Sequence, residues 1–500
     1  MSAFCYDLVV VGGGINGAGI ARDAAGRGLS VLLVEQDDLA SHTSSASSKL
    51  IHGGLRYLEQ RQFGLVRKAL GERERLLAAA PHIIWPLRFV MPHDASQRPA
   101  WMIRVGLFLY DHLARRDRLP GSAAVDLRSH PAGAVLRPGL RRGFVYSDAW
   151  VQDARLVVLS AMDAQLCGAR IATRTALVGA RRGPDRWSLD LRTAAGRSQT
   201  VQARAVVNAA GPWVESVLRK VLGLGAAHAV RLVKGSHIVV PRLFDHPYAY
   251  LFQNPDRRVL FALPFEDYFT LLGTTDVEEP GDPARAAITA AEIDYLCAMA
   301  SRCFARPVTA ADVRWSFAGV RPLLDEPGQA AARVTRDYTL ELDRAGAPVL
   351  SVFGGKLTTY RLLAEQAVDR LMPLLGRRAG PWTADAHLPG GEFAGGDFDA
   401  FLAQVRQRYG WLPDGLARRL ARNYGTRIER ILGGASSLAS LGESVLPGLY
   451  AAELAYLVHE EFARTPQDIL WRRTKLGLHA PPDAAERLQA WLDSAALAVA

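Results

Sequence analysis

The sequence has few cysteines and no long apolar run. Its cysteines, in 500 residues, are Cys5, Cys167, Cys297 and Cys303. Because their spacing matches neither a metal site nor a redox motif, we expect a reduced, cytosolic compartment. No apolar run approaches the roughly 18 residues of a membrane-spanning helix, and no cationic leader followed by an apolar segment opens the chain. We therefore expect a protein that is neither exported nor transmembrane.

The sequence also lacks internal repeats and nucleic-acid-binding modules. The formal net charge is +10 at pH 7, which suits nucleic acid, an anionic membrane surface or an anionic substrate as a partner. The arginines are scattered, and neither a zinc finger nor an RNA-binding motif accompanies them. Nucleic acid is therefore the least favoured partner. With 49% hydrophobic and 22% charged residues, the chain is typical of a globular protein of two or three domains.

A glycine-rich turn follows a β-branched run near the start of the chain. Residues 7–11 are expected to form a strand, and Gly12, Gly14 and Gly17 follow it before a helical segment. In a βαβ unit these glycines allow a tight turn, the approach of a pyrophosphate and close helix packing. A second strand, residues 29–34, ends at Glu35, whose carboxylate suits ribose hydroxyls. The alternative is a purely structural turn, which does not explain why an acidic residue stands at the end of the second strand, at the usual distance in sequence from the glycines.

This turn occurs in both FAD and NAD proteins and does not choose between them. A second glycine pair, Gly354-Gly355, follows an apolar strand at residues 350–353 and precedes a helix predicted from Leu357 to Leu371. The N-terminus of that helix would stabilise the anion that two-electron reduction leaves on a flavin. These features favour FAD. Lys356 could serve the flavin, a substrate phosphate, or both.

Residues 41–59 are dense in small hydroxyls and contain the pair Gly53-Gly54. Hydroxyls and backbone donors suit a diphosphate, and glycine allows a flat ring to lie against the backbone. A polar surface loop is the alternative. Arg56 and Tyr57 follow the glycines directly and would lie beside whatever the glycines hold.

Residues 230–275 are mostly β in pattern and predict an antiparallel sheet inserted in the dinucleotide fold. His237 interrupts one of its apolar strands, either as a structural residue or as a base. Arg321, between apolar neighbours, requires an anion, which is a substrate or a structural partner. Arg336 is more ambiguous because Asp337 is adjacent to it.

Two segments outside these motifs are organised as helices. Residues 98–116 join aromatic residues to flanking arginines, which suits either a membrane interface or a buried amphipathic helix. Beyond a Gly-rich linker at residues 388–392, periodic segments predict a helical C-terminal region in which nothing suggests chemistry.

The glycine turn, the block from Ser44 to Glu59 and the later blocks together resemble the FAD-dependent glycerol-3-phosphate dehydrogenases of the bacterial aerobic type, almost end to end. The resemblance implies an α/β fold. This is an FAD-binding Rossmann-like fold of the glutathione-reductase/amino-acid-oxidase type, with an inserted antiparallel β substrate domain and a C-terminal helical domain. The implied FAD-binding domain comprises residues 1–80, 145–225 and 315–388, the substrate-binding or cap region residues 81–144 and 226–314, and the helical domain residues 389–500.

The resemblance also implies the site. The expected FAD-binding residues are Gly12, Gly14, Ile15, Asn16, Gly17, Glu35, Gln36, Ser44, Ser45, Ser47, Ser48, Gly53, Gly54, Leu55, Gly211, Trp213, Gly354, Gly355, Lys356, Leu357 and Thr358. The expected substrate-binding residues are Arg56, Tyr57, His237, Arg321, Arg336 and Lys356, of which His237, Arg321 and Lys356 are the catalytic candidates. His237 is the natural base by its ordinary pKa, while Arg321 could instead polarise the developing alkoxide.

The implied reaction is oxidation of sn-glycerol 3-phosphate to dihydroxyacetone phosphate, with electrons passed to ubiquinone or menaquinone. The family implies peripheral attachment to the anionic cytoplasmic face of the inner membrane and a possible homodimer. No metal is expected. The alternatives are an oxidase that uses O₂, a related amino-acid-type oxidase acting on a carboxylate, and a basic flavoprotein that binds RNA or partners without turnover.

Overall fold

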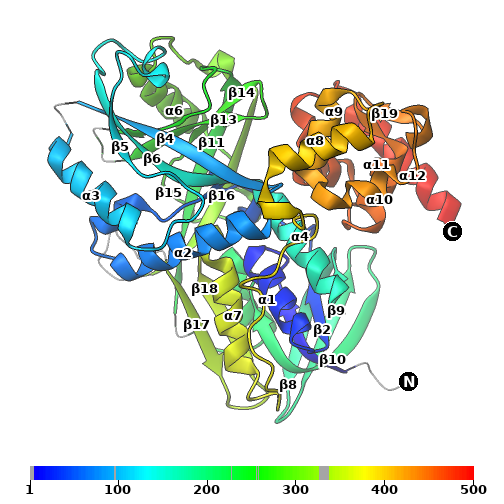
Figure 1. Cartoon of the computed structure of the whole chain (residues 1–500). Coiled ribbons are helices and arrows are strands. Elements are labelled where there is room, and N and C mark those ends of the chain that lie inside the picture. The colour runs from blue at the N-terminus through cyan, green and yellow to red at the C-terminus, as the bar shows by residue number, and fades with distance from the viewer. Residues whose placement is uncertain are drawn as a thin grey trace.

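The computed structural model describes residues 5–94, 97–226, 228–254, 256, 258–325 and 337–499. It contains two large sheets with helices packed on them and a helical C-terminal region beside them (Figure 1). The first sheet lies in the lower half of Figure 1 and the second in the upper half, while the C-terminal helices lie at the right.

The first sheet has the strand order β17-β18-β10-β1-β2-β7, and a β8–β9 hairpin extends β10. The central strands β18, β10, β1, β2 and β7 are parallel, as expected of a dinucleotide fold. The bounds are β1 Cys5–Val11, β2 Val31–Val34, β7 Arg170–Ala172, β8 Thr175–Arg182, β9 Trp187–Thr193, β10 Ser198–Asn208, β17 Tyr338–Asp343 and β18 Val349–Gly354.

Strand β1 is buried on both faces because alternate side chains enter different cores. Leu8 and Val10 pack in the core that contains α1 (Ile15–Gly26), α4 (Asp153–Leu166) and α7 (Tyr360–Leu371). Val9 and Val11 pack in a second core with Trp187 and with the short helical segment after α5 (Val214–Ser216). The predicted apolar run therefore has no solvent face.

The second sheet has the order β15-β11-β14-β13-β12-β4-β6-β3, with β16 paired to β11 and β5 to β6. It is antiparallel except between β12 and β4. The bounds are β3 Leu50–Ile51, β4 Ile84–His93, β5 Ala123–Asp126, β6 Arg142–Val151, β11 Val230–Pro241, β12 Ala249–Gln253, β13 Val259–Phe265, β14 Phe269–Gly273, β15 Val277–Glu278 and β16 Trp315–Leu324.

Three helices cover this second sheet. Helices α2 (Phe63–Ala79) and α3 (Ala100–His112) pack on one face, and α6 (Ala290–Cys303) packs on the other, so that two cores lie on opposite sides of the strands. Thr289 caps α6 in a capping box with Glu292, where the sequence has a hydroxyl three residues before an acid.

Sheet membership differs from two of the predicted domain boundaries. Strands β6 and β16 fall wholly or mainly in the segments assigned to the FAD-binding domain, which begin at residues 145 and 315, but both pair within the second sheet. The reason is that hydrophobic alternation identifies a strand without identifying its neighbour. These two strands carry the chain between the domains.

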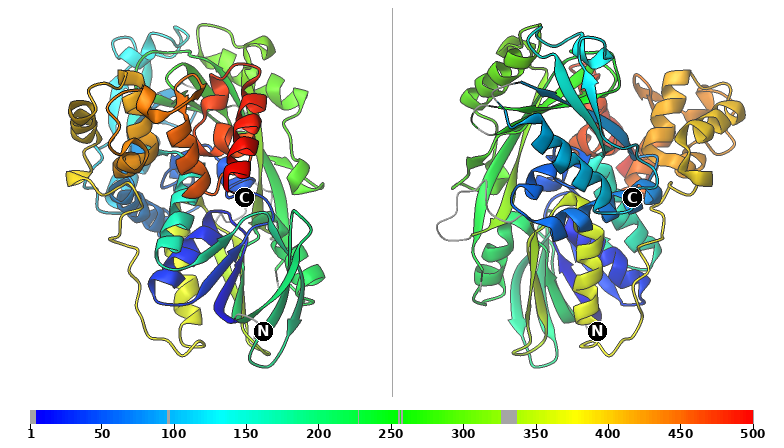
Figure 2. Two further views of the ribbon diagram at one scale, coloured as in Figure 1. Left: turned by 90° about the vertical axis from the view of Figure 1, so that its right-hand side faces the viewer. Right: turned by 60° about the vertical axis from the view of Figure 1, so that its left-hand side comes forward.

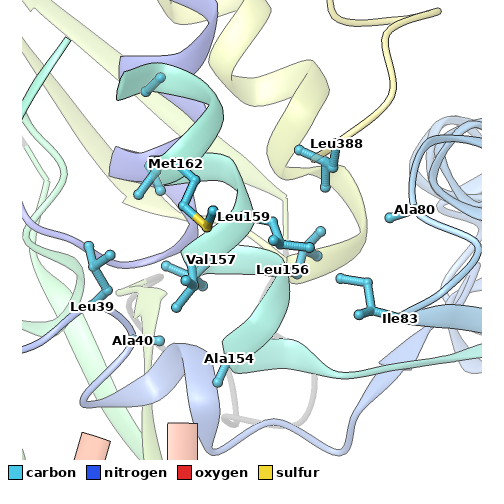
Figure 3. Close-up of a cluster of buried hydrophobic side chains, with 14 of the residues drawn as sticks. Leu39, Ala40, Ala80, Ile83, Ala154, Leu156, Val157, Leu159, Met162 and Leu388 are labelled. Atoms are coloured by element: carbon cyan, nitrogen blue, oxygen red, sulfur yellow. The ribbon is translucent and has the colours of Figure 1, made fainter. Parts of the chain in front are cut away.

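The C-terminal region consists of α8 Phe398–Arg408, α9 Asp414–Tyr424, α10 Ile428–Leu432, α11 Ala451–His459 and α12 Ala484–Val499, with a hairpin of β19 Ser444–Leu446 and β20 Leu449–Tyr450. It shares one continuous core with the first domain. Figure 3 shows part of that core around α4, where Ala80, Ile83 and Leu388 lie beside Leu156. The linker before α8 runs along the outside of the first domain (Figure 2).

Candidate functional site

A cavity of about 550 Å³ lies between the two sheets. It opens at the carboxyl ends of β1, β2, β10 and β18, where Val11, Val34, Ala209 and Gly354 line it. Open parallel sheets bind ligands at this edge because the strand-to-helix turns meet there. The second sheet closes the other side with side chains from β12, β13 and β16.

The glycine turn occupies one end of the cavity, which we call the dinucleotide end. Gly12 has φ +110°, and a Cβ on it would lie 2.5 Å from the carbonyl oxygen of Ala209. A Cβ on Gly17 would overlap the carbonyl oxygen of Gly12, so both positions exclude a side chain. Helix α1 begins after Gly14, and its N-terminal N–H groups and dipole face a position suited to a pyrophosphate.

Glu35 stands at the end of β2 in the same region. Its Oε2 accepts a hydrogen bond from Gly13 N at 2.6 Å, and its Oε1 accepts one from Asp37 N at 2.8 Å. Burial raises the pKa of Glu35, and these two backbone N–H groups oppose the rise. The carboxylate is thus held in place at the cavity wall, in a position that suits hydrogen bonds from ribose hydroxyls.

The serines of the segment 44–48, which we call the serine block, face in two directions. Ser44, Ser47 and Ser48 line the cavity, and Ser44 Oγ accepts a hydrogen bond from Ile15 N at 3.0 Å. Ser45 faces away: its Oγ donates to the carbonyl of His42, and it lines a smaller pocket behind the block.

The second glycine pair lines the same cavity, beside Asn16 of α1; we call the part around this pair the substrate end. Gly354 and Gly355 have φ of +74° and +103°, and Lys356 precedes a helical turn that leads into α7. The Lys356 ammonium lies 3.6 Å from the ring centre of Tyr57, a cation–π contact. Tyr57 also packs directly over Gly54. The segment that contains Gly54 and Tyr57 therefore meets Lys356, which is about 300 residues further along the chain.

Three cationic side chains line the cavity together: Arg56, Arg321 and Lys356. Arg321 Nη1 donates to Asp276 Oδ1 at 2.6 Å, and Nη2 donates to Thr274 Oγ1 at 3.1 Å. Asp276 therefore orients the guanidinium. The fourth expected cation, Arg336, lies outside the described residues.

His237 lies behind the cavity wall. Its Nε2 is 2.9 Å from Ser48 Oγ, and its ring stacks on Phe317 with centroids 4.8 Å apart. Burial, then Arg321 and Lys49, lowers the pKa of His237 well below its ordinary value. The imidazole is therefore a weaker base than its ordinary pKa predicts, and it is connected to the cavity through the Ser48 hydroxyl.

The structure brings most of the predicted site residues to one cavity. The predicted residues that line it are Gly12, Gly14, Ile15, Asn16, Glu35, Gln36, Ser44, Ser47, Ser48, Gly54, Leu55, Arg56, Tyr57, Gly211, Trp213, Arg321, Gly354, Gly355, Lys356, Leu357 and Thr358. Gly17, Ser45, Gly53 and His237 do not line it. Gly17 packs α1 on the turn, and Gly53 donates its N–H to the hydroxyl of Tyr110 at 2.8 Å.

Sequence reasoning missed several polar residues that line the cavity, among them Asp276, Thr274 and His42. Thr274 and Asp276 lie directly after β14, so the end of a strand in the inserted sheet was the available signal. His42 packs edge-on against Trp213 with centroids 4.7 Å apart and pairs with Asp37 at 2.9 Å. Trp213 is far from His42 in the sequence, so no local pattern reports that contact, whereas Asp37 is only five residues away.

The residues present fit FAD. The glycine turn leaves no space for side chains at Gly12 and Gly17, Glu35 is fixed at the end of β2, and the start of a second helical segment, Lys356 to Thr358, also lines the cavity. Asn16 donates its Nδ2 to the carbonyl of Gly354 at 3.3 Å, while its buried Oδ1 has no hydrogen-bond partner within the described residues. A buried acceptor without a hydrogen bond therefore lies at the wall of the cavity, which Asn16 lines.

Two family models match the chain. The model of the FAD dependent oxidoreductases matches residues 7–361, and the model of the C-terminal domain of alpha-glycerophosphate oxidase matches residues 381–497. The boundary between the models falls in the linker that the structure shows before α8. Together they cover both the cavity and the helical region.

Several relatives match over nearly their whole length. A glycerol-3-phosphate dehydrogenase of Pseudomonas aeruginosa is 53% identical over 491 residues, which are 98% of this chain and 95% of the relative. The D-erythritol 1-phosphate dehydrogenase of Brucella abortus is 50% identical, covering 98% of each chain. The aerobic glycerol-3-phosphate dehydrogenase of Escherichia coli is 49% identical, covering 97% of each.

The fold has a matching solved structure, the glycerol-3-phosphate dehydrogenase of Bacillus halodurans complexed with FAD. The TM-score is 0.79 at 28% identity, and the match covers 98% of this chain and 90% of the other. The first family model is that of FAD-dependent enzymes, the solved structure is a complex with FAD, and the relatives share most of the chain with this protein. The chain therefore belongs to the FAD-dependent oxidoreductases and, within them, to the glycerol-3-phosphate dehydrogenase family.

Proposed function

We propose that the protein oxidises sn-glycerol 3-phosphate to dihydroxyacetone phosphate. The observation that carries this proposal is that Arg56, Arg321 and Lys356 line one cavity. Three cations suit a phosphate dianion better than a single carboxylate, because each can supply a charge-assisted hydrogen bond. This argues against an amino-acid-type substrate. The relatives' names support the same substrate class.

Different side chains act on the phosphate and on the carbinol of the substrate. Arg321, oriented by Asp276, and Lys356 hold the phosphate. FAD, when bound in the cavity, would supply the hydride acceptor for the carbinol carbon. The hydroxyl proton passes through Ser48 to His237 Nε2, which requires the tautomer with the ring proton on Nδ1. Arg321 also lies where it could stabilise the developing alkoxide.

A longer polyol phosphate is a second candidate substrate. A relative with 50% identity over almost the whole chain carries the name D-erythritol 1-phosphate dehydrogenase, so overall similarity does not separate the two substrates. Both share the phosphate and the adjacent carbinol, and they differ in hydroxymethylene units that would lie away from the phosphate-binding cations. The first experiment therefore includes both compounds.

For the electrons, we propose ubiquinone or menaquinone as acceptor, with O₂ use by an oxidase as the alternative. No helix in the described part of the chain is both long enough and apolar enough to cross a bilayer, so access to a quinone requires attachment to the membrane surface. We place this attachment at the cytoplasmic face of the inner membrane.

Helix α3 is the proposed contact with the membrane. Ile103, Leu107 and Tyr110 pack on the second sheet. The opposite face exposes a group of apolar side chains, namely Trp101, Met102, Val105, Phe108 and Leu109. The basic side chains nearby are Arg104 on the same helix and Arg67, Arg115 and Arg116 in an adjacent groove. Apolar side chains flanked by arginines suit an anionic bilayer, where rings enter the headgroup region.

Anaerobic bleaching of the bound flavin tests the substrate. We expect bleaching by sn-glycerol 3-phosphate, by D-erythritol 1-phosphate or by both, and none by glycerol or lactate. Subsequent fast reoxidation by a soluble quinone with little peroxide would support the dehydrogenase, whereas rapid peroxide formation in air would identify an oxidase. A yellow protein that neither phosphate ester bleaches would overturn the substrate assignment.

A further inference from the structure

The loop after β2, residues 35–42, forms one wall of the dinucleotide end. Besides Glu35, which accepts from Gly13 N, the loop's Ala40 N donates to the carbonyl of Gly13 at 3.1 Å. Leu39 and Ala40 are buried, and Figure 3 shows them beside Val157 of α4. The position of this loop therefore determines where the Glu35 carboxylate and the glycine turn lie.

The C-terminal region holds this loop through Asp38, which is 2% exposed. Arg473 donates to both carboxylate oxygens of Asp38, at 2.7 and 2.8 Å, and Arg472 Nε donates to Asp38 Oδ2 at 2.6 Å. The two arginines belong to a one-turn π-helix, η12 (Asp468–Arg473), more than 430 residues away in the sequence. Because the ion pair is bidentate and buried, it fixes both the distance and the orientation of the loop relative to η12.

A second connection holds the other side of the loop. Arg174, in the turn between β7 and β8, donates its backbone N–H to the carbonyl of Asp37 at 2.7 Å. Its guanidinium donates to Asp468 Oδ2 at 2.7 Å, and Asp468 Oδ1 accepts from Arg472 Nη2 at 2.5 Å. The loop is thus held from its backbone and from its carboxylate by the same π-helical segment.

We propose that the segment Asp468–Arg473 is a positioning strap for the adenosine half of FAD. By fixing Asp38, the strap holds Glu35 and the glycine turn in the geometry that binds the ribose and pyrophosphate. The C-terminal region, in which the sequence shows no chemistry, thereby contributes to cofactor affinity without contacting the cofactor. Arg472 and Arg473 are positioning residues in this account, and the inference rests on FAD binding and not on the identity of the substrate.

General docking of the two domains is the competing explanation, and the chain offers a matched control for it. Arg155 of α4 donates to the carboxylate of Glu461 and, at 2.8 Å, to the carbonyl of Asn423. This ion pair is as buried as that of Arg473 and joins the same two domains. Within the described residues it contacts none of the 35–42 loop. Glu461 also accepts a hydrogen bond from Arg473 Nε through its backbone carbonyl, at 2.9 Å. The Arg155→Met substitution leaves that backbone contact in place, so it weakens docking and keeps the bonds of Arg473 to Asp38.

The experiment compares FAD release from the full-length holoenzymes of Arg473→Met, Arg472→Gln and Arg155→Met, using the fluorescence of free FAD after equilibrium dialysis. We expect a dissociation constant at least tenfold higher for Arg473→Met and about threefold higher for Arg472→Gln. Arg155→Met should lower the thermal midpoint but stay within about twofold of the parent in FAD affinity. Equal loss in Arg155→Met and Arg473→Met, or no loss in Arg473→Met, would overturn the proposal. Should Arg473→Met fail to fold, the milder Arg472→Gln decides in the same way.

Competition by ADP locates the defect. ADP carries only the adenosine diphosphate half of the cofactor, so a strap variant should lose ADP and FAD affinity by the same factor. The ADP concentration that displaces half of a saturating FAD concentration should then equal that of the parent. If ADP instead becomes tenfold more effective, the lost contact lies at the flavin half and the strap assignment fails.

Discussion

The two ends of the cavity are built in different ways. At the dinucleotide end, the groups that face the ligand are mainly backbone N–H groups and one carboxylate from a single βαβ unit, residues 5–35. At the substrate end, Arg56, Lys356 and Arg321 come from a loop after β3, the start of α7 and strand β16. The first end is local in sequence and the second is assembled from distant segments.

This difference implies different sensitivity to mutation. A backbone-built end tolerates changes of side chain except where a Cβ has no space, whereas a side-chain-built end depends on each charged group. The following experiments test that contrast.

The largest effect is expected for His237→Asn. Loss of the proton acceptor behind Ser48 should slow flavin reduction at saturating substrate by about 10²- to 10⁴-fold, the usual contribution of a positioned base. FAD should remain bound, because His237 lies away from the dinucleotide end. Rapid-mixing absorbance of the flavin measures the rate, and a change below about threefold would remove His237 from the mechanism.

Arg321→Met should lower kcat/KM by about 10²-fold. The substitution removes a charge-assisted donor of about 1.5–3 kcal/mol and leaves the carboxylate of Asp276 in the cavity without this guanidinium. Most of the loss should be in KM, with FAD affinity unchanged. The conservative Arg321→Lys serves as control and should recover part of the activity, while equal FAD loss would mean that the two ends are not separable.

Gly12→Ala should weaken FAD binding by about 10²-fold. The new Cβ would lie 2.5 Å from the carbonyl of Ala209 at a φ of +110°, and such backbone strain amounts to about 1–3 kcal/mol before the clash is added. Gly71→Ala is the control, because a Cβ there meets nothing within 4 Å in helix α2. Flavin content after dialysis measures both, and unchanged content in Gly12→Ala would contradict a backbone-built site.

The double substitution Trp101→Ser/Phe108→Ser should lower partitioning onto anionic vesicles by about 10- to 100-fold. Full burial of one such side chain contributes about 1.5–3 kcal/mol, and the expected loss corresponds to partial burial of the two rings in the headgroup region. Trp101 is 66% and Phe108 is 58% exposed. Leu166→Ser/Val178→Ser removes exposed apolar side chains elsewhere and should have no effect. Flotation with vesicles measures the bound fraction; equal effects of the two pairs would remove α3 as the membrane contact.

The smallest effect concerns acid stability. The folded-state pKa of His237 is lowered below its unfolded value near 6.5 by burial and by Arg321 and Lys49. As the pH falls below about 6.5, the unfolded state binds a proton that the folded state does not, so stability falls by up to about 1.4 kcal/mol per pH unit. Urea midpoints between pH 7.5 and 5.5 should show a shallower pH dependence for His237→Asn than for the parent. Parallel curves would mean that His237 is protonated in the folded protein.

The sequence by itself determined the local elements and the cofactor. Glycine spacing requires a particular backbone path, and an apolar run followed by a helix predicts a strand-to-helix turn, so Gly12, Gly14 and Glu35 could be assigned from neighbouring residues alone. The helical C-terminal segments followed from periodicity for the same reason, because the period of a helix is a property of consecutive residues.

Only the tertiary structure decided which strands pair and which side chains meet. Strands β6 and β16 join the second sheet, Asp276 orients Arg321, and His237 lies behind Ser48 instead of in the cavity wall. The contact of Arg473 with Asp38 belongs to the same class. Such contacts depend on the packing of segments hundreds of residues apart, and a single sequence carries no local signal for them.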